Sequence, residues 1–193
     1  MPRILFYDTE TTGKLDFKKP ITDPCQPKIM QMGVMLDDEL KNIVHQFAYI
    51  IKPYYEWKSE YEEAVSIHGI TYETARKYGV PIEQLFQSFK NLLLNADLCV
   101  CHNVAYDSKV IQHTLLTKFQ GKTLPELPHH CTMKETTNLC KLKGSHGFKW
   151  PKLEELYRFL FNEEFEGAHD ALIDVKATRR CFYELVKRGV FKI

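Results

Sequence analysis

A short apolar run that ends in alternating carboxylates constrains the fold of this chain more than any other feature. Residues 4–8 are predicted to form a buried strand, and the segment DTETTG at residues 8–13 places Asp8 and Glu10 two positions apart. Because residues two apart on a strand point to the same face, both carboxylates should project together from the strand end. Adjacent carboxylates repel each other unless a cation compensates, and such hard oxygen ligands suit magnesium or manganese. Taken alone, the segment could also be an acidic strand end that leads into a polar turn.

The remaining pattern predicts an α/β fold with a mixed sheet. Two further strands are expected at residues 29–36 and 43–51, joined by a turn at Asp37–Asp38, which favours an antiparallel arrangement. Strands and helices then alternate, which is typical of α/β domains. Helices are expected at residues 60–66 (broken by Gly69), 81–95, 103–118 (capped by Asn103), 152–161 and 171–188, and short strands at 98–101 and 131–132, the latter followed by a short helix to about 140. Residues 17–27 and 121–130 are expected to be loops.

Length and composition exclude several other classes of protein. A chain of 193 residues is long enough for one buried core and too short for two ordinary domains, so we expect one domain over residues 1–193. Hydrophobic residues at 44% and charged residues at 26% are typical of a globular protein. No signal peptide and no apolar run of about 18 residues is present, so no membrane association is expected. The six cysteines lack disulfide-framework spacing, which favours reduced thiols and a cytoplasmic location. The net charge of +1 does not by itself indicate a nucleic-acid-binding protein.

Two further acidic positions occur near predicted helix starts. Asp107 follows a strand in the segment HNVAYD (residues 102–107) and should face inward from the first turn of a helix. It could instead only stabilise the helix dipole. In HDALID (residues 169–174), Asp170 is a candidate helix cap, Asp174 lies just over one turn into the helix, and His169 lies in the approach to it. A histidine there could also be structural.

Taken together, these segments resemble the DEDDh family of 3′→5′ exonucleases, which includes the proofreading subunit of bacterial replicative DNA polymerases. The resemblance covers about residues 4–188 and rests on DTETTG, HNVAYD and HDALID in that order, and on EAVSIHGI at residues 63–70. It implies a ribonuclease-H-like fold, a mixed five-stranded sheet flanked by helices. Gln31 stands where many members carry a glutamate that is not a ligand. That proofreading subunit has a polymerase-binding tail after its nuclease domain, whereas this chain ends at Ile193, so no such partner is expected.

The resemblance also implies a reaction and a set of catalytic residues. Single nucleotides would be removed from single-stranded 3′ ends of DNA or RNA as nucleoside 5′-monophosphates. Asp8, Glu10 and Asp174 would hold the metal ion that activates the attacking water, and Asp8 and Asp107 the ion at the leaving oxygen. About four negative charges in one pocket require compensation, which two Mg²⁺ ions supply and Mn²⁺ could replace. His169 is the candidate general base, since imidazole titrates near neutral pH.

Other residues are expected to bind the end of the strand. By resemblance, Glu63 and His68 contact the terminal nucleotide, and Thr12 and the backbone of Gly13 are placed for its phosphate or sugar. Tyr106 could stack on a base or be buried beneath its helix. The segment 141–152 combines lysines with Trp150, so it could bind a single strand or be a solvated loop.

The sequence leaves rival interpretations open. One is a non-catalytic nucleic-acid-binding module with the same fold, although the catalytic positions are all filled. Another is a phosphatase with an aspartyl nucleophile, although that chemistry commonly uses D-x-D at the first strand. A zinc cluster of His129, His130, Cys131, Cys140 and His146 fits no familiar spacing. The sequence does not distinguish DNA from RNA, nor proofreading from repair, RNA turnover or phage DNA metabolism.

Overall fold

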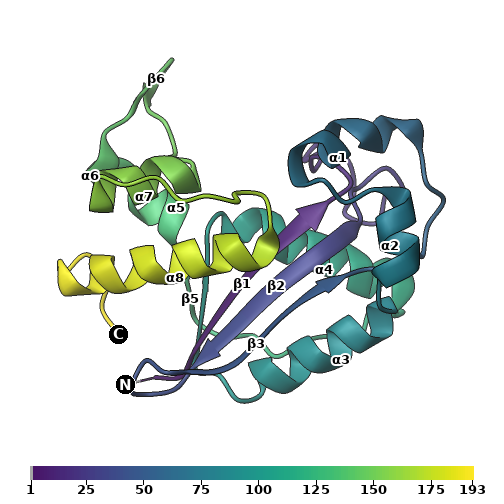
Figure 1. The fold of residues 1–193 in the computed structure, drawn as a ribbon, viewed down its shortest axis with the longest axis horizontal. Coiled ribbons are helices and arrows are strands. Elements are labelled where there is room, and N and C mark those ends of the chain that lie inside the picture. The colour runs from purple at the N-terminus through teal and green to yellow at the C-terminus, as the bar shows by residue number, and fades with distance from the viewer. Residues whose placement is uncertain (1) are drawn as a thin grey trace.

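A mixed five-stranded sheet forms the centre of the computed structural model, which describes residues 2–193 (Figure 1). The order across the sheet is β3-β2-β1-β4-β5. Neighbours among β1, β2 and β3 are antiparallel, whereas β4 is parallel to β1 and β5 is parallel to β4. The predicted α/β fold with a five-stranded mixed sheet is therefore confirmed. The strands are β1 (Ile4–Thr11), β2 (Ile29–Asp37), β3 (Ile43–Ile50), β4 (Leu98–Cys101) and β5 (His129–Cys131).

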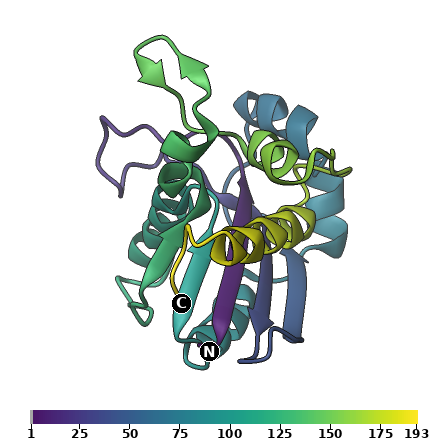
Figure 2. The same ribbon diagram turned by 90° about the vertical axis from the view of Figure 1, so that its left-hand side faces the viewer.

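Helices cover both faces of the sheet. One layer contains α3 (Ile82–Leu93) and α4 (Val104–Lys118), and the opposite layer contains α7 (Leu153–Phe161) and α8 (Ala171–Lys187), which crosses the front of the sheet in Figure 2. The 3₁₀ turn Ser59–Tyr61, α1 (Glu62–His68) and α2 (Tyr72–Tyr78) lie near the end of β1, on the side away from the hairpin of β6 (Lys143–Gly144) and β7 (Gly147–Phe148) (Figure 1). The short helices α5 (Thr132–Glu135) and α6 (Thr137–Cys140) lead from β5 to that hairpin. None of the helices within residues 2–193 combines the length and apolar character needed to cross a membrane.

Strand β1 lies at the centre of both cores because its two faces are apolar. Leu5 and Tyr7 pack into the core beneath α3 and α4, whereas Ile4 and Phe6 pack against α7 and α8. Phe6 meets Phe182 of α8 edge-on, with ring centroids 5.7 Å apart. Alternation along the strand therefore directs the next even-numbered residues towards the layer that holds α8.

Some local predictions were wrong. The helix α2 was missed, although Thr71 caps it by accepting a hydrogen bond from the Thr74 backbone (3.2 Å), a pattern that its sequence carries. Asn103 precedes α4 but does not cap it: its φ is 71° and its side chain makes no cap bond. The chain turns from β4 into α4 within two residues, and asparagine tolerates the left-handed conformation required there. Thr132 begins α5 instead of ending a strand, and β5 begins at His129, within the expected loop.

The segment 141–152 is also not a simple loop. It contains the two-stranded hairpin β6–β7, in which Lys143 pairs with Phe148 and Gly144 with Gly147. The hairpin projects from the body of the protein in Figure 2 and pairs with no strand of the main sheet.

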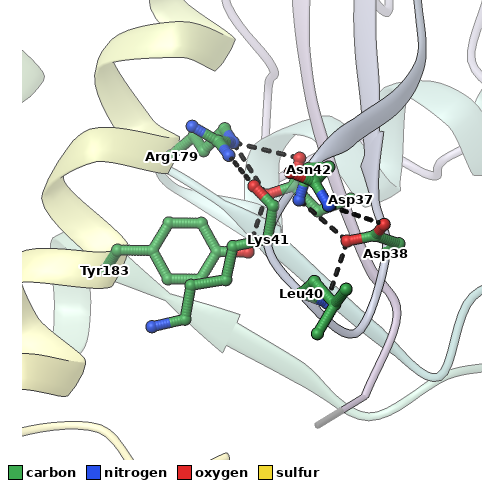
Figure 3. A network of polar contacts seen from close by, with 7 residues as sticks. All are labelled: Asp37, Asp38, Leu40, Lys41, Asn42, Arg179 and Tyr183. Atoms are coloured by element: carbon green, nitrogen blue, oxygen red, sulfur yellow. Dashed lines mark hydrogen bonds and ion pairs between the residues drawn. The ribbon is translucent and has the colours of Figure 1, made fainter.

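Asp37 belongs to the end of β2 and not to the following turn. Its buried carboxylate accepts hydrogen bonds from Arg179 Nε at 2.7 and 3.0 Å and from the Tyr183 hydroxyl at 2.6 Å (Figure 3). Arg179 also donates to the Lys41 carbonyl at 2.7 Å. The turn itself is held by Asp38, whose Oδ1 accepts from two backbone amides of the turn. The network attaches the C-terminal half of α8 to the β2–β3 connection.

Candidate active site

Asp8 and Glu10 both lie within β1, which extends to Thr11, three residues further than the sequence pattern indicated. They share the face that looks towards α8, as predicted from their spacing. β4 pairs with β1 only as far as Phe6, so the end of β1 projects beyond its parallel neighbour. Side chains from both helical layers can therefore reach this end of the strand.

The start of α8 supplies Asp174 and His169. Asp170 caps the helix, because its Oδ1 accepts hydrogen bonds from the backbone amides of Leu172 (3.0 Å) and Ile173 (3.2 Å). One turn later, Asp174 Oδ2 accepts a hydrogen bond from the backbone amide of His169 at 3.1 Å. His169 has a left-handed φ of 71° and a side chain that is 49% exposed. The cap and this bond fix the histidine next to the aspartate.

Asp107 approaches from the opposite helical layer. It is buried in the first turn of α4, as the sequence predicted. Its Oδ1 accepts hydrogen bonds from the backbone amide and hydroxyl of Thr9 at 3.0 and 2.7 Å, and its Oδ2 accepts one from the Cys101 thiol at 3.2 Å. These three donors attach the carboxylate to the ends of β1 and β4.

The carboxylates are close enough to resist ionisation together. Burial, followed by the charges of Asp107, Asp174 and Glu10, raises the pKa of Asp8 well above its usual range. Burial and the charge of Asp174 raise the pKa of Glu10 to about 8, and burial raises that of Asp174 to about 7. Burial likewise raises the pKa of Asp107 to about 6, although its hydrogen bonds oppose the rise. The four predicted carboxylates therefore meet in one electrostatic site.

The donor set fits divalent cations that prefer oxygen ligands. One ligand atom from each of Glu10, His169 and Asp174 lies within 4.8 Å of the other two. Asp174 Oδ1 is buried and has no hydrogen-bond partner among the residues that the structure describes, so a carboxylate oxygen is available within this group. Asp8 and Asp107 are not members of this group of three, but they line a hollow that Asp174 and His169 also line.

Two hollows meet at this site and share Lys14, Tyr106 and His169. The first hollow, of about 460 Å³, extends from Glu10 to α1. The second hollow, of about 600 Å³, extends from Asp8, Asp107 and Asp174 to the segment Trp150–Glu154. The carboxylates thus stand where a ligand could pass from one hollow into the other.

The residues expected to hold a terminal nucleotide, Thr12, Glu63 and His68, line the first hollow. Nδ1 of His68 accepts a hydrogen bond from the Ile70 amide at 3.0 Å, so Nε2 carries the proton in the neutral ring. Nε2 is buried and has no hydrogen-bond partner within residues 2–193. Burial lowers the pKa of His68, and the nearby Thr11 backbone partly opposes this change. Glu63 is exposed and pairs with Lys14 at 3.5 Å. The Thr12 hydroxyl accepts a bond from the Lys28 amide at 2.9 Å.

Tyr106 is half-buried, and its hydroxyl donates to the Gly13 carbonyl at 2.5 Å and lies 2.6 Å from the Thr11 hydroxyl. These bonds fix the turn after β1, and they do not decide between stacking on a base and burial beneath the helix. The ring still lines both hollows.

The sequence did not reveal Gln31 as a residue of the site. Its Nε2 donates to Asp170 Oδ2 at 3.1 Å, and its Oε1 accepts from the Ala171 amide at 3.0 Å. An amide can make both bonds at once, since it has a donor and an acceptor. Gln31 therefore holds the first turn of α8 against β2 beside an acidic cap.

The alternative zinc cluster receives no support. His130 Nδ1 lies 2.9 Å from Glu135, and the Cys131 sulfur accepts a bond from the Lys134 amide. Within residues 2–193, the one group with metal-binding spacing is the Glu10, His169 and Asp174 set.

Comparison with known proteins identifies the family. The RNase T exonuclease family model matches residues 5–182. Solved structures with the same fold include E. coli exonuclease I in a zinc-bound complex with single-stranded DNA (TM-score 0.72, 23% identity, 96% of this chain and 40% of that chain). A second is E. coli exonuclease I with a dT13 oligonucleotide (TM-score 0.71, 22% identity, 97% of this chain and 41% of that chain). A third is exonuclease I from Methylocaldum szegediense (TM-score 0.70, 21% identity, 96% of this chain and 40% of that chain). No curated protein sequence matches the chain significantly.

The chain spans about two fifths of the length of these exonuclease I chains, and at this identity the likeness shows the fold. The family match is independent of that likeness and covers β1, the start of α4 and the start of α8, the three segments that carry the acidic residues. The chain therefore belongs to the DEDD exonuclease family and has its ribonuclease-H-like fold.

Proposed function

We propose that the protein hydrolyses the terminal phosphodiester bond at single-stranded 3′ ends of DNA or RNA and releases nucleoside 5′-monophosphates. The observation that carries the proposal is the meeting of Glu10, His169 and Asp174 at the junction of two hollows. A strand end bound in the first hollow would place its scissile phosphate beside these groups, with the rest of the strand leaving through the second.

Asp8, Glu10, Asp107 and Asp174 would hold two divalent cations, Mg²⁺ or Mn²⁺. When bound, such ions neutralise the carboxylates and stabilise the charge that develops on the phosphate oxygens during displacement. The raised carboxylate pKa values support this role, because cation binding offsets the mutual repulsion that causes part of the rise.

His169 would accept the proton of the attacking water at a ring nitrogen. Its imidazole stands beside Glu10 and Asp174, and Nε2 lies 3.9 Å from Glu154 Oε1. The Glu154 carboxylate would stabilise the imidazolium that forms, and the exposed ring can pass the proton on to solvent. The backbone bond to Asp174 keeps His169 in place during this transfer.

The first hollow supplies contacts for the terminal nucleotide. His68 lines this hollow, and its Nε2 proton would donate to a sugar hydroxyl or a base edge once the ring turns from its buried position, while Lys14 would bring a positive charge to the phosphate. These contacts would fix the scissile bond over the carboxylates, and a displacement of about 1 Å can cost roughly 10²-fold in rate.

The test uses single-stranded DNA, duplex DNA and short RNA, each labelled at the 5′ end and incubated with Mg²⁺ or with excess chelator. We expect a ladder that shortens from the 3′ end, release of 5′-monophosphates, and no reaction in chelator. The Asp174→Asn variant is the matched control for a contaminating nuclease. Internal fragments without a ladder, release of inorganic phosphate, or full activity in chelator would contradict the proposal.

A further inference from the structure

The second hollow connects the acidic centre to an exposed aromatic side chain. Asp8 and Asp107 line one end of it, and Met133, Trp150 and Lys152 line the other. Trp150 is 59% exposed, although its ring is a large aromatic surface that proteins usually bury. The Lys134 ammonium lies 5.5 Å from the centre of the Trp150 ring, within the range of a cation–π interaction.

The backbone on both sides of Trp150 is fixed to the body of the protein. His102 Nε2 lies 3.1 Å from the Pro151 carbonyl, and Nδ1 lies 3.0 Å from the Thr132 hydroxyl, so the His102 ring, just after β4, links the residue that follows Trp150 to the start of α5. Burial lowers the pKa of His102 to about 4, so this bridge is neutral near pH 7. On the other side, the Lys149 amide donates to the Leu142 carbonyl at 2.9 Å at the base of the hairpin, and Leu142 packs against the core beneath α7 and α8. An exposed ring on an anchored backbone loses little conformational freedom when it binds a partner.

The charge around this ring is opposite to that of the carboxylate centre. Lys134, Lys143 and Lys152 make no ion pair with any residue in the range 2–193, whereas Lys149 pairs with Glu155. Unpaired ammonium groups beside an aromatic ring match the phosphates and bases of a single strand. A protein partner is less well matched, because the exposed rings of Phe148 and Trp150 are set among lysines.

We propose that Trp150 and Lys134 form a stacking platform for a base upstream of the cleaved bond, with Lys143 of the β6–β7 hairpin guiding the strand beyond it. This inference rests on the proposed function, since it places the strand end in the first hollow. The platform binds any base, because every base has a π face, and it favours single strands, whose bases are free to leave their own stack.

Binding can be tested apart from catalysis. In chelator, a 5′-labelled thymidine oligonucleotide is titrated into the protein and its anisotropy is recorded. The Trp150→Ala variant should bind the oligonucleotide about 5- to 150-fold more weakly, because one base stack is lost. The Trp150→Phe variant should retain most of the affinity. Tyr78→Ala is the matched control, since Tyr78 is an exposed ring with Lys77 at 4.9 Å and lines neither hollow. Lys134→Gln should reduce the slope of log affinity against log salt by about 0.7.

A second readout reports contact directly. In the Trp57→Phe variant, Trp150 is the one remaining tryptophan, and its fluorescence should be quenched as the oligonucleotide binds. An unquenched signal together with unchanged affinity of Trp150→Ala would overturn the proposal and leave the hairpin as a surface for a protein.

Measurements of hydrolysis rates then distinguish a failure of the Trp150 platform from a failure of the proposed exonuclease function. The kcat/KM for the oligonucleotide is divided by that for the p-nitrophenyl ester of thymidine 5′-monophosphate, which has no upstream base. Trp150→Ala should lower this ratio about 5- to 150-fold, through KM. An equal loss on both substrates would overturn the platform, because it would show a structural role for the ring. If the unaltered protein hydrolysed neither substrate, the proposed function would fail while the anisotropy and fluorescence still tested the platform.

Discussion

Gly33 lies directly opposite Asp8 in the β1–β2 pair, and the backbone of α8 occupies the space that a side chain at position 33 would need. A Cβ atom there would come within 2.4 Å of the Ala171 carbonyl oxygen. The absence of a side chain thus allows the start of α8, with His169 and Asp174, to approach the strand that carries Asp8.

We therefore expect Gly33→Ala to separate the helix start from β1. Overpacking of this kind costs about 1–3 kcal/mol of stability, and the shift of Asp174 should lower kcat by about 10²-fold or more. Urea unfolding and exonuclease assays at saturating Mg²⁺ measure the two effects. A variant with native stability and native kcat would show that α8 can move away without disturbing the site.

Replacement of Asp8 and of His169 should have different effects. Asp8→Ala should abolish both activity and most Mn²⁺ binding, because this carboxylate is assigned to both ions. His169→Ala should retain Mn²⁺ binding and lose roughly 10²- to 10⁴-fold in rate, the range for a lost general base. Calorimetric titration with Mn²⁺ separates the two cases. Loss of Mn²⁺ binding in His169→Ala would make the histidine a ligand, which its position beside Glu10 and Asp174 also permits.

In chelator, the free energy of unfolding should fall as the pH rises, which is opposite to the effect of carboxylates with lowered pKa values. The folded protein holds protons on Glu10, Asp174 and Asp107 up to pH values of about 8, 7 and 6, whereas the unfolded chain releases them near pH 4. Between these limits the native state binds more protons, so the free energy of unfolding should fall as pH rises from about 4 to 8. Mg²⁺ should restore stability most strongly near pH 8. Urea midpoints measured across this range check the sign, and Glu10→Gln should flatten the slope. A metal-free stability that rises with pH would contradict the carboxylate cluster.

His68→Ala should weaken the hold on the strand end. The loss of the Nε2 donor should lower kcat/KM for every 3′ end and weaken binding of a nucleoside 5′-monophosphate in parallel, while Mn²⁺ affinity stays the same. Glu63→Ala should act in the same direction. Because Glu63 is exposed, its replacement should not change the melting temperature. Intact product affinity in both variants would assign the terminal nucleotide to other residues.

The acidic residues were predictable from sequence because local rules position them. Strand alternation fixes Asp8 and Glu10, and the two helix starts fix Asp107 and Asp174. The central sheet could likewise be inferred from apolar runs, since β1 is buried on both faces. The identity of the family, in contrast, came from the order of the motifs.

Other features depend on contacts between distant residues, for which the sequence pattern has no signal. Gln31 meets Ala171 across 140 positions, and Arg179 meets Asp37 across 142. The role of His102 was hidden in the same way, because its partners at Thr132 and Pro151 come from segments that are adjacent only after folding. The predicted cap at Asn103 was wrong because asparagine is common both at helix caps and in left-handed turns.

Helix α8 is bound to β2 at two levels, by Gln31 at its first turn and by the Asp37 carboxylate at Arg179 and Tyr183. Its backbone amides between these contacts should therefore exchange with deuterium only when the helix leaves the central sheet. The hairpin β6–β7, which pairs only with itself, should exchange far sooner. The protein would thus keep its carboxylates in register even while the hydrogen bonds of the neighbouring hairpin open to solvent.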